Sequence, residues 1–154
     1  MLYHISKLHH TDQELIRKAP LLVSILVAGA DGVIEHEEIE KAVSLIHTKS
    51  FSEASDIRHL YKDIDHDVEE TLDKLLKGLP SDAKEREKII TAELEQLNHV
   101  MTKLDGQVAL DFYNSLRNFA VHVAQTSGGV FGMLKLNFHE KEVVKLPMLA
   151  KPSH

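Results

Sequence analysis

Three carboxylates lie close together in the sequence, beginning with the Asp31 of an Asp31-Gly32 pair. Asp31 lies in an expected loop, and Glu35 and Glu38 lie in the first turn of the helix expected to follow it. Carboxylate oxygens are the ligands that Ca²⁺ and Mg²⁺ take in proteins, so this spacing predicts a site for a divalent cation. The same residues are also typical of an Asp-Gly turn leading into an acidic helix N-terminus, which binds no metal. On the residues alone, the turn is the favoured interpretation.

A complete EF-hand site is excluded at this position. Counting Asp31 as position 5 of the loop and Glu38 as position 12 places Val27 and Gly29 at positions 1 and 3. Neither residue offers a side-chain oxygen, and calcium loops of this kind need carboxylates there. The metal, if one binds, therefore stays unidentified.

A second group of candidate ligands is Asp56, His59, Asp63 and His66, which we call the 56–66 stripe. Its spacings of three, four and three residues place all four side chains on one face, provided that a single helix runs through them. The alternative to a noncatalytic protein is therefore a metal-dependent enzyme using either the Asp31/Glu38 pair or this stripe. A solvated helix face with ion pairs is the more ordinary interpretation, and no catalytic triad or carboxylate pair can be singled out. We expect no enzyme activity.

The elements that must position these residues are helices. Apolar residues recur at intervals of three and four, as in Ile90, Leu94, Leu97, Met101 and Leu104, which predicts amphipathic helices. The expected segments are 11–20 and 21–28 with a kink or a helix start at Pro20, then 35–48, two helices within 51–77, 81–104 beginning at a Ser81 cap, 109–123, and 138–149.

Composition supports an all-α helical bundle that forms one domain over residues 1–154, with its core between about 12 and 150. The absence of cysteine excludes disulfides and thiolate metal sites. A net charge of −6 argues against nonspecific nucleic-acid binding, which needs a basic surface. We find no targeting or membrane-spanning segment, so a cytoplasmic location is expected.

A weak internal twofold repeat is visible. The apolar helix 21–28, a glycine-containing loop and the acidic helix 35–48 recur as 112–124, 127–137 and 138–149. Aligning the halves on their glutamates places Glu38 opposite Glu142, which adds Glu142 to the candidate metal ligands.

The same motifs resemble the TerB-like (tellurite-resistance) family. The first is Leu22 to Ile34, which contains Ala30-Asp31-Gly32 and is followed by Glu38 and Ile39; the second runs from Ala124 through Gly128-Gly129 to Glu142. The resemblance extends over about residues 12–150. It implies an all-α bundle with a twofold repeat, clustered acidic residues proposed to bind metal ions, and a role in stress response within membrane-associated complexes. Lys135 falls opposite Asp31, so only the first-half ligands match the family well.

Taken together, these features predict a noncatalytic stress-response module that binds a protein partner, and a divalent cation as its cofactor, through an acidic face. Peripheral membrane association through a complex and homo-oligomer formation both stay open. The apolar loop 127–137 is either folded onto the bundle or exposed as a contact surface, and we favour burial.

Overall fold

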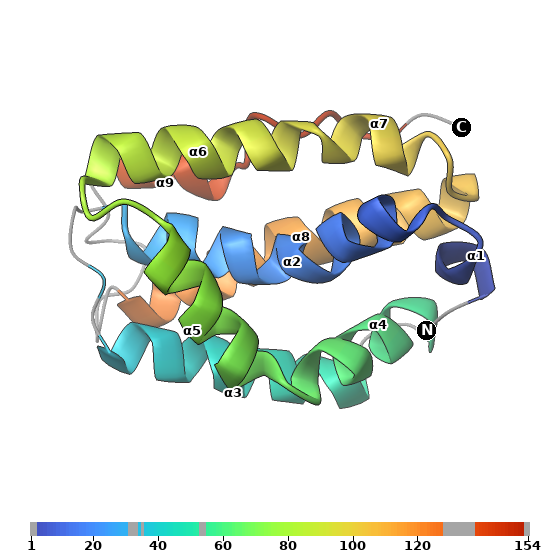
Figure 1. Cartoon of the computed structure of the whole chain (residues 1–154), viewed down its shortest axis with the longest axis horizontal. Helices are drawn as coiled ribbons and strands as arrows, with labels where there is room; N and C mark the ends of the chain where they lie inside the picture. Colours follow the sequence, from blue (N-terminus) through green and yellow to red (C-terminus); the bar gives the residue numbers. More distant parts are fainter. Residues whose placement is uncertain (1–2, 31–33, 35, 53–54, 128–137, 153–154) are drawn as a thin grey trace.

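In the computed structural model, the described residues are 3–30, 34, 36–52, 55–127 and 138–152. These residues form helices and connecting segments without a strand, which confirms the all-α helical bundle (Figure 1). The helices are α1 (Tyr3–Ser6), α2 (His10–Ala28), α3 (His36–Ser52), α4 (Ser55–Asp65), α5 (Val68–Gly78), α6 (Ala83–Glu95), α7 (Leu97–Met101), α8 (Gly106–Ser127) and α9 (Phe138–Val144).

Helices α2 and α8 form the centre of the bundle and run side by side in the same direction (Figure 1). On one side of this pair, α3 and α4 form an antiparallel hairpin; on the other side lie α6, α7 and α9. Helix α5 crosses the front of the molecule and joins the two sides (Figure 1). Every outer helix therefore needs a neighbour in the centre to cover its apolar face.

The sequence of α2 explains its central place. Every residue from Ala19 to Ala28 is buried, so the helix has no solvated face along its second half. Pro20 lies inside α2, and the helix continues through it as one element, where the sequence predicted a kink or a new start. Proline removes one backbone donor and its ring crowds the carbonyl four residues earlier, and the burial of the surrounding apolar side chains outweighs both costs.

The prediction of one long helix over 81–104 was wrong in two respects. The N-cap is Asp82, whose Oδ2 accepts a 2.9 Å hydrogen bond from the backbone N–H of Glu85, and not Ser81. The helix is also divided at Gln96 into α6 and α7. The apolar seam nevertheless stays buried from Ile90 to Leu104. Burial and continuity of the backbone are separate properties, and the periodic pattern predicts only burial.

Helices α3 and α9 have comparable places beside the central pair, and the twofold repeat itself stays a prediction. Helix α3 follows α2 and contacts both central helices, and α9 follows α8 and also contacts both of them, from the opposite side (Figure 1). The second unit is shorter, because α9 ends at Val144 where the sequence predicted a helix to Leu149. The backbone turns at Leu146, whose φ of 50° lies in the left-handed region.

The segment after α9 is held on α7 by one side-chain amide. Asn98 Nδ2 donates a 2.9 Å hydrogen bond to the carbonyl of Met148, and Asn98 Oδ1 accepts a 2.8 Å hydrogen bond from the backbone N–H of Ala150. The amide thereby satisfies two backbone groups of the turn that follows α9, in which the N–H of Leu149 also donates a hydrogen bond to the carbonyl of Leu146.

Candidate functional site

The motif Ala30-Asp31-Gly32 follows the end of α2, where Gly29 is packed closely. Gly29 is the C-cap, and its N–H donates a 2.9 Å hydrogen bond to the carbonyl of Ile25. Arg86 from α6 is only 8% exposed, and its guanidinium donates to the carbonyls of Gly29 (3.4 Å) and Ser81 (3.3 Å). A Cβ on Gly29 would lie 2.8 Å from Arg86 Nη2, so the space needed by the arginine explains the glycine. Sequence spacing did not reveal the role of Arg86, which lies 57 residues from Gly29.

The four predicted cation ligands divide into two that the structure describes and two that it does not. Asp31 and Glu35 lie outside the described residues. Glu38, in the first turn of α3, is 8% exposed. Glu142 on α9 is half-buried and forms a 3.2 Å ion pair with Lys145. Since α3 and α9 flank the central helices from opposite sides, the structure does not bring Glu38 and Glu142 together (Figure 1).

Within the described ranges, no group of three or more His, Asp or Glu side chains is arranged to hold a metal ion. The cation site at the loop before α3 therefore stays a prediction, which depends on Asp31 and Glu35.

The 56–66 stripe does not lie on a single helix. Helix α4 ends at Asp65, so His66 lies in the turn before α5. The side chain of Asp63 forms an ion pair with α2, in which its Oδ2 lies 3.0 Å from Arg17 Nε. His59 is exposed, and the side chain of Asp56 lies outside the described residues. For Asp63, the ordinary interpretation of an ion-paired helix face is confirmed.

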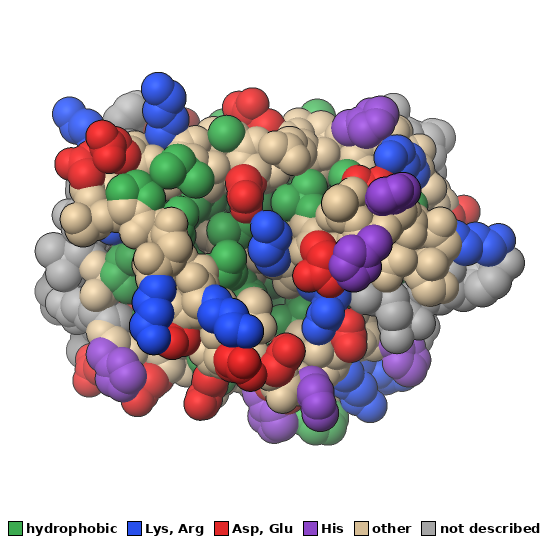
Figure 2. Space-filling model, viewed as in Figure 1, with side chains coloured by type: hydrophobic (Ala, Val, Ile, Leu, Met, Phe, Trp, Pro, Cys, Tyr) green, Lys and Arg blue, Asp and Glu red, His purple; other side chains and the backbone are tan. Residues whose placement is uncertain are grey.

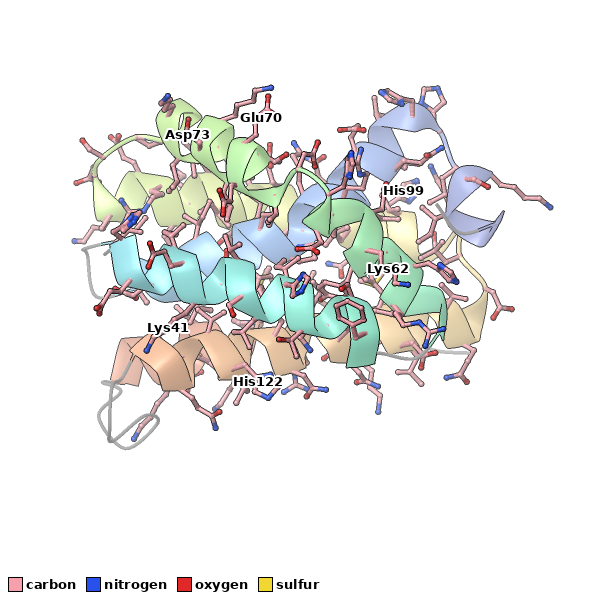
Figure 3. The ribbon with its side chains drawn as sticks, turned by 90° about the horizontal axis from the view of Figure 1, so that it is seen from below. Lys41, Lys62, Glu70, Asp73, His99 and His122 are labelled. Carbon is pink, nitrogen blue, oxygen red and sulfur yellow. The ribbon has the colours of Figure 1, made fainter. Side chains whose placement is uncertain are left out.

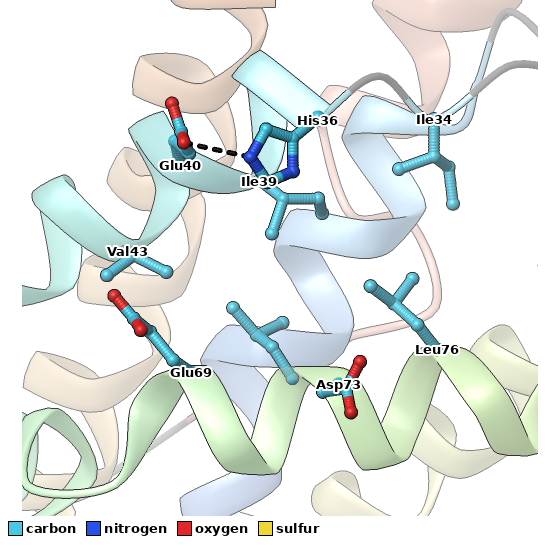
Figure 4. Close-up of a pocket in the computed structure, with 9 residues that line it drawn as sticks. Ile34, His36, Ile39, Glu40, Val43, Glu69, Asp73 and Leu76 are labelled. Carbon is cyan, nitrogen blue, oxygen red and sulfur yellow. Dashed lines mark ion pairs between the residues drawn. The ribbon is translucent and has the colours of Figure 1, made fainter.

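A groove of about 670 Å³ lies between α3 and α5 (Figure 4). Its apolar lining consists of Ile34, Ile39, Val43, Leu72 and Leu76. Those of them that lie on helices have the three- and four-residue spacing that is typical of an apolar, core-facing helix face. The structure buries Leu72 but leaves Ile39, Val43 and Leu76 half-buried along the groove.

Carboxylates stand on both walls of the groove. Glu40 comes from α3, and Glu69 and Asp73 come from α5 (Figure 4). Glu40 Oε1 lies 2.9 Å from His36 Nε2, and Asp73 Oδ2 lies 2.9 Å from Lys77 Nζ. Both pairs are largely exposed, and pairs of this kind contribute little to stability.

No Lys or Arg occurs among the described residues that line the groove. Lys41, one position after Glu40, lies on the side of α3 that faces away from α5 (Figure 3). Lys77 on α5 pairs with Asp73 of the rim, and the hydrogen bond from Lys77 to the Asp73 carboxylate raises the pKa of Lys77 above its ordinary value. The groove therefore combines an apolar base with an acidic rim.

The two walls are held by different contacts. Helix α3 packs against α4, α8 and α2, and the α3–α4 hairpin is fixed on α8 by a buried 2.9 Å hydrogen bond from Ser115 Oγ to Tyr61 Oη. Helix α5 packs chiefly on α2. Its Leu72 is 1% exposed, and apolar side chains reach the surface on the face that α5 crosses (Figure 2).

Comparisons of the chain with protein-family models, with curated proteins and with solved structures found no match. The resemblance to the TerB-like family accordingly rests on the motifs themselves. In the part of the chain that the structure describes, no helix combines the length and the apolar character needed to cross a membrane.

Proposed function

We propose that the protein is a noncatalytic stress-response module of the TerB-like kind, which binds a protein partner at the groove between α3 and α5. The observation that carries the partner-binding part is the groove itself, with half-buried Ile39, Val43 and Leu76 facing an open space of about 670 Å³. Covering apolar side chains releases water and provides most of the free energy of protein association. The stress-response part is supported by the motif from Leu22 to Ile34 and by Glu38 after it.

Partner binding at the groove is testable by photo-crosslinking in the source cells. A photoreactive amino acid replaces Val43, which lines the groove, or Ile89, which is exposed on α6 and serves as a control. We expect a covalent adduct with another protein from position 43 and none from position 89. The absence of an adduct at position 43, with and without tellurite stress, contradicts the proposal.

Charge-reversed variants connect the adduct to the stress response. The groove pair Glu40→Lys/Glu69→Lys changes the rim, and the matched pair Glu37→Lys/Glu70→Lys makes the same net change outside the groove on the same two helices. The groove pair should lose both the adduct and the protection of cells against tellurite, while the matched pair keeps both. Full protection by the groove pair would separate the groove from the stress response and refute their connection.

The divalent cation remains a second element of the proposal. Calorimetric titration of metal-stripped protein with Ca²⁺, Mg²⁺, Mn²⁺ and Zn²⁺, beside the Asp31→Asn/Glu38→Gln variant, tests it directly. Saturable binding that the variant loses supports a cation site at the loop before α3. The alternative of a metal-dependent enzyme requires in addition an open coordination position next to a pocket.

A further inference from the structure

The described residues of the groove offer one kind of recognition surface. Two helices form its walls, and helices satisfy their own backbone hydrogen bonds, so the walls present side chains and no free strand edge. Addition of a partner strand needs such an edge, and recognition of proline-rich segments needs aromatic walls, which the described lining lacks. An apolar strip between two helices is the surface that receives the apolar face of a third helix.

The charges of the rim predict which residue types lie beside the apolar face of such a helix. Glu40 stands on one wall and Glu69 and Asp73 on the other, so carboxylates border the apolar strip from both sides (Figure 4). A helix lying in the groove would bring the residues beside its apolar face next to these carboxylates. Lys or Arg at those positions would be attracted, whereas Asp or Glu would be repelled.

We propose that the occupant of the groove is an amphipathic helix of a partner protein, with apolar residues at positions i, i+3 or i+4, and i+7, and with Lys or Arg on both flanks of that face. This inference rests on the proposed function, because it names the class of partner that the module would bind. The volume of about 670 Å³ has room for several large side chains of such a helix. It lies within the range of roughly 300–1,000 Å³ in which protein pockets bury ligands.

The test uses the full chain and a defined probe. The probe is a fluorescent peptide of about 14 residues, roughly four helical turns, with Leu along one face and Lys on both flanks. A covalent staple on its polar face keeps it helical, since short helices are marginal in water. A second peptide carries Glu in place of every Lys. Fluorescence anisotropy measures binding of both peptides to the wild type, the groove pair Glu40→Lys/Glu69→Lys and the matched pair Glu37→Lys/Glu70→Lys.

The Lys peptide should bind the wild type and the matched pair with affinities within about twofold, and the groove pair about tenfold more weakly. The Glu peptide should bind none of them measurably. Both variants have the same net charge, so nonspecific attraction of the Lys peptide to an acidic protein would weaken equally in both. Equal weakening of its binding in the two variants would therefore overturn the inference. Equal binding of the two peptides to the wild type would overturn it as well. Circular dichroism verifies that both variants are folded.

Other occupants would give different outcomes. Self-association of the wild type that the groove pair abolishes, measured by sedimentation, would identify a second copy of the chain and overturn the inference. An adduct at position 43 in cells, together with no binding of the Lys peptide, overturns the basic helix but leaves the proposed function standing. Groove-specific peptide binding without any adduct in cells supports the recognition of basic helices and contradicts the proposed function.

Discussion

Replacing Gly29 with alanine should destabilise the protein, whereas the same replacement at Gly78 should not. The new Cβ at position 29 would lie 2.8 Å from Arg86 Nη2, 3.0 Å from the carbonyl oxygen of Ile25 and 3.1 Å from Ile34 Cγ1. The first distance is shorter than real Cβ atoms show, and the other two are tighter than most real Cβ contacts. The Ile25 oxygen belongs to the backbone of α2, and a shift of Arg86 Nη2 would lengthen its buried hydrogen bond to the Gly29 carbonyl, so relief of either contact lowers stability.

The magnitude follows from two opposing contributions. Overpacking of a tight site costs about 1–3 kcal/mol, and the smaller conformational freedom of alanine in the unfolded chain returns about 0.4–1 kcal/mol. We expect Gly29→Ala to lower the free energy of unfolding by about 1–2 kcal/mol. For a chain of this length, that corresponds to a melting temperature lower by about 2–8 °C.

Gly78 provides the matched control. It is the last residue of α5, and a Cβ there would meet no atom within 4 Å. Gly78→Ala should therefore raise the free energy of unfolding by up to about 1 kcal/mol. Urea denaturation followed by far-UV circular dichroism measures both variants. The reasoning is refuted if Gly29→Ala is as stable as the wild type or more stable. In an Arg86→Ala background the cost of Gly29→Ala should fall, because the shortest contact is gone.

Two further perturbations test contacts at other places in the fold. Asp73→Asn should lower the pKa of Lys77, measured by an NMR titration of its side chain, because the carboxylate that accepts its hydrogen bond is lost. Because the pKa of Lys77 is higher in the folded state, its contribution to stability is present below the unfolded pKa and is lost as the pH rises through the folded pKa. An unchanged pKa of Lys77 in the variant would contradict Asp73 as the cause of the shift. Asn98→Ala should remove about 1 kcal/mol for each of its two backbone hydrogen bonds and speed amide exchange at Ala150, while Asn118→Ala, an exposed change on α8, should leave that exchange as it is.

The sequence predicted burial better than it predicted helix ends. The apolar stretch of α2, which only Ser24 interrupts between Ala19 and Ala28, marks a helix that must be surrounded by others, and it forms the centre of the bundle. Ser81 and Asp82 are both good caps, and only the position of the Glu85 N–H selects between them. Likewise, the apolar seam that continues past Gln96 does not reveal that the backbone is divided there.

The groove was beyond sequence reasoning for a related reason. The spacing of Ile39 and Val43 shows that α3 has an apolar face, but it does not say whether another helix covers that face completely. Coverage depends on where α5 crosses, and that position is set by contacts of α5 with α2. Arg86 was missed because its role depends on a carbonyl 57 residues away. For the predicted cation site, sequence spacing identified acidic residues near the loop. Whether their carboxylates meet depends on Asp31 and Glu35, which lie outside the described residues.

The weak attachment of α5 gives the two walls of the groove different mechanical properties. Helix α3 is held by α4, α8 and α2, whereas α5 packs chiefly on α2. Segments with few packed neighbours open at a lower free energy than the core does. Amides of α5 should therefore exchange with solvent earlier than those of α3. The α3 wall of the groove would then be fixed and the α5 wall able to shift, so the groove would accept helices whose anchoring side chains differ in size.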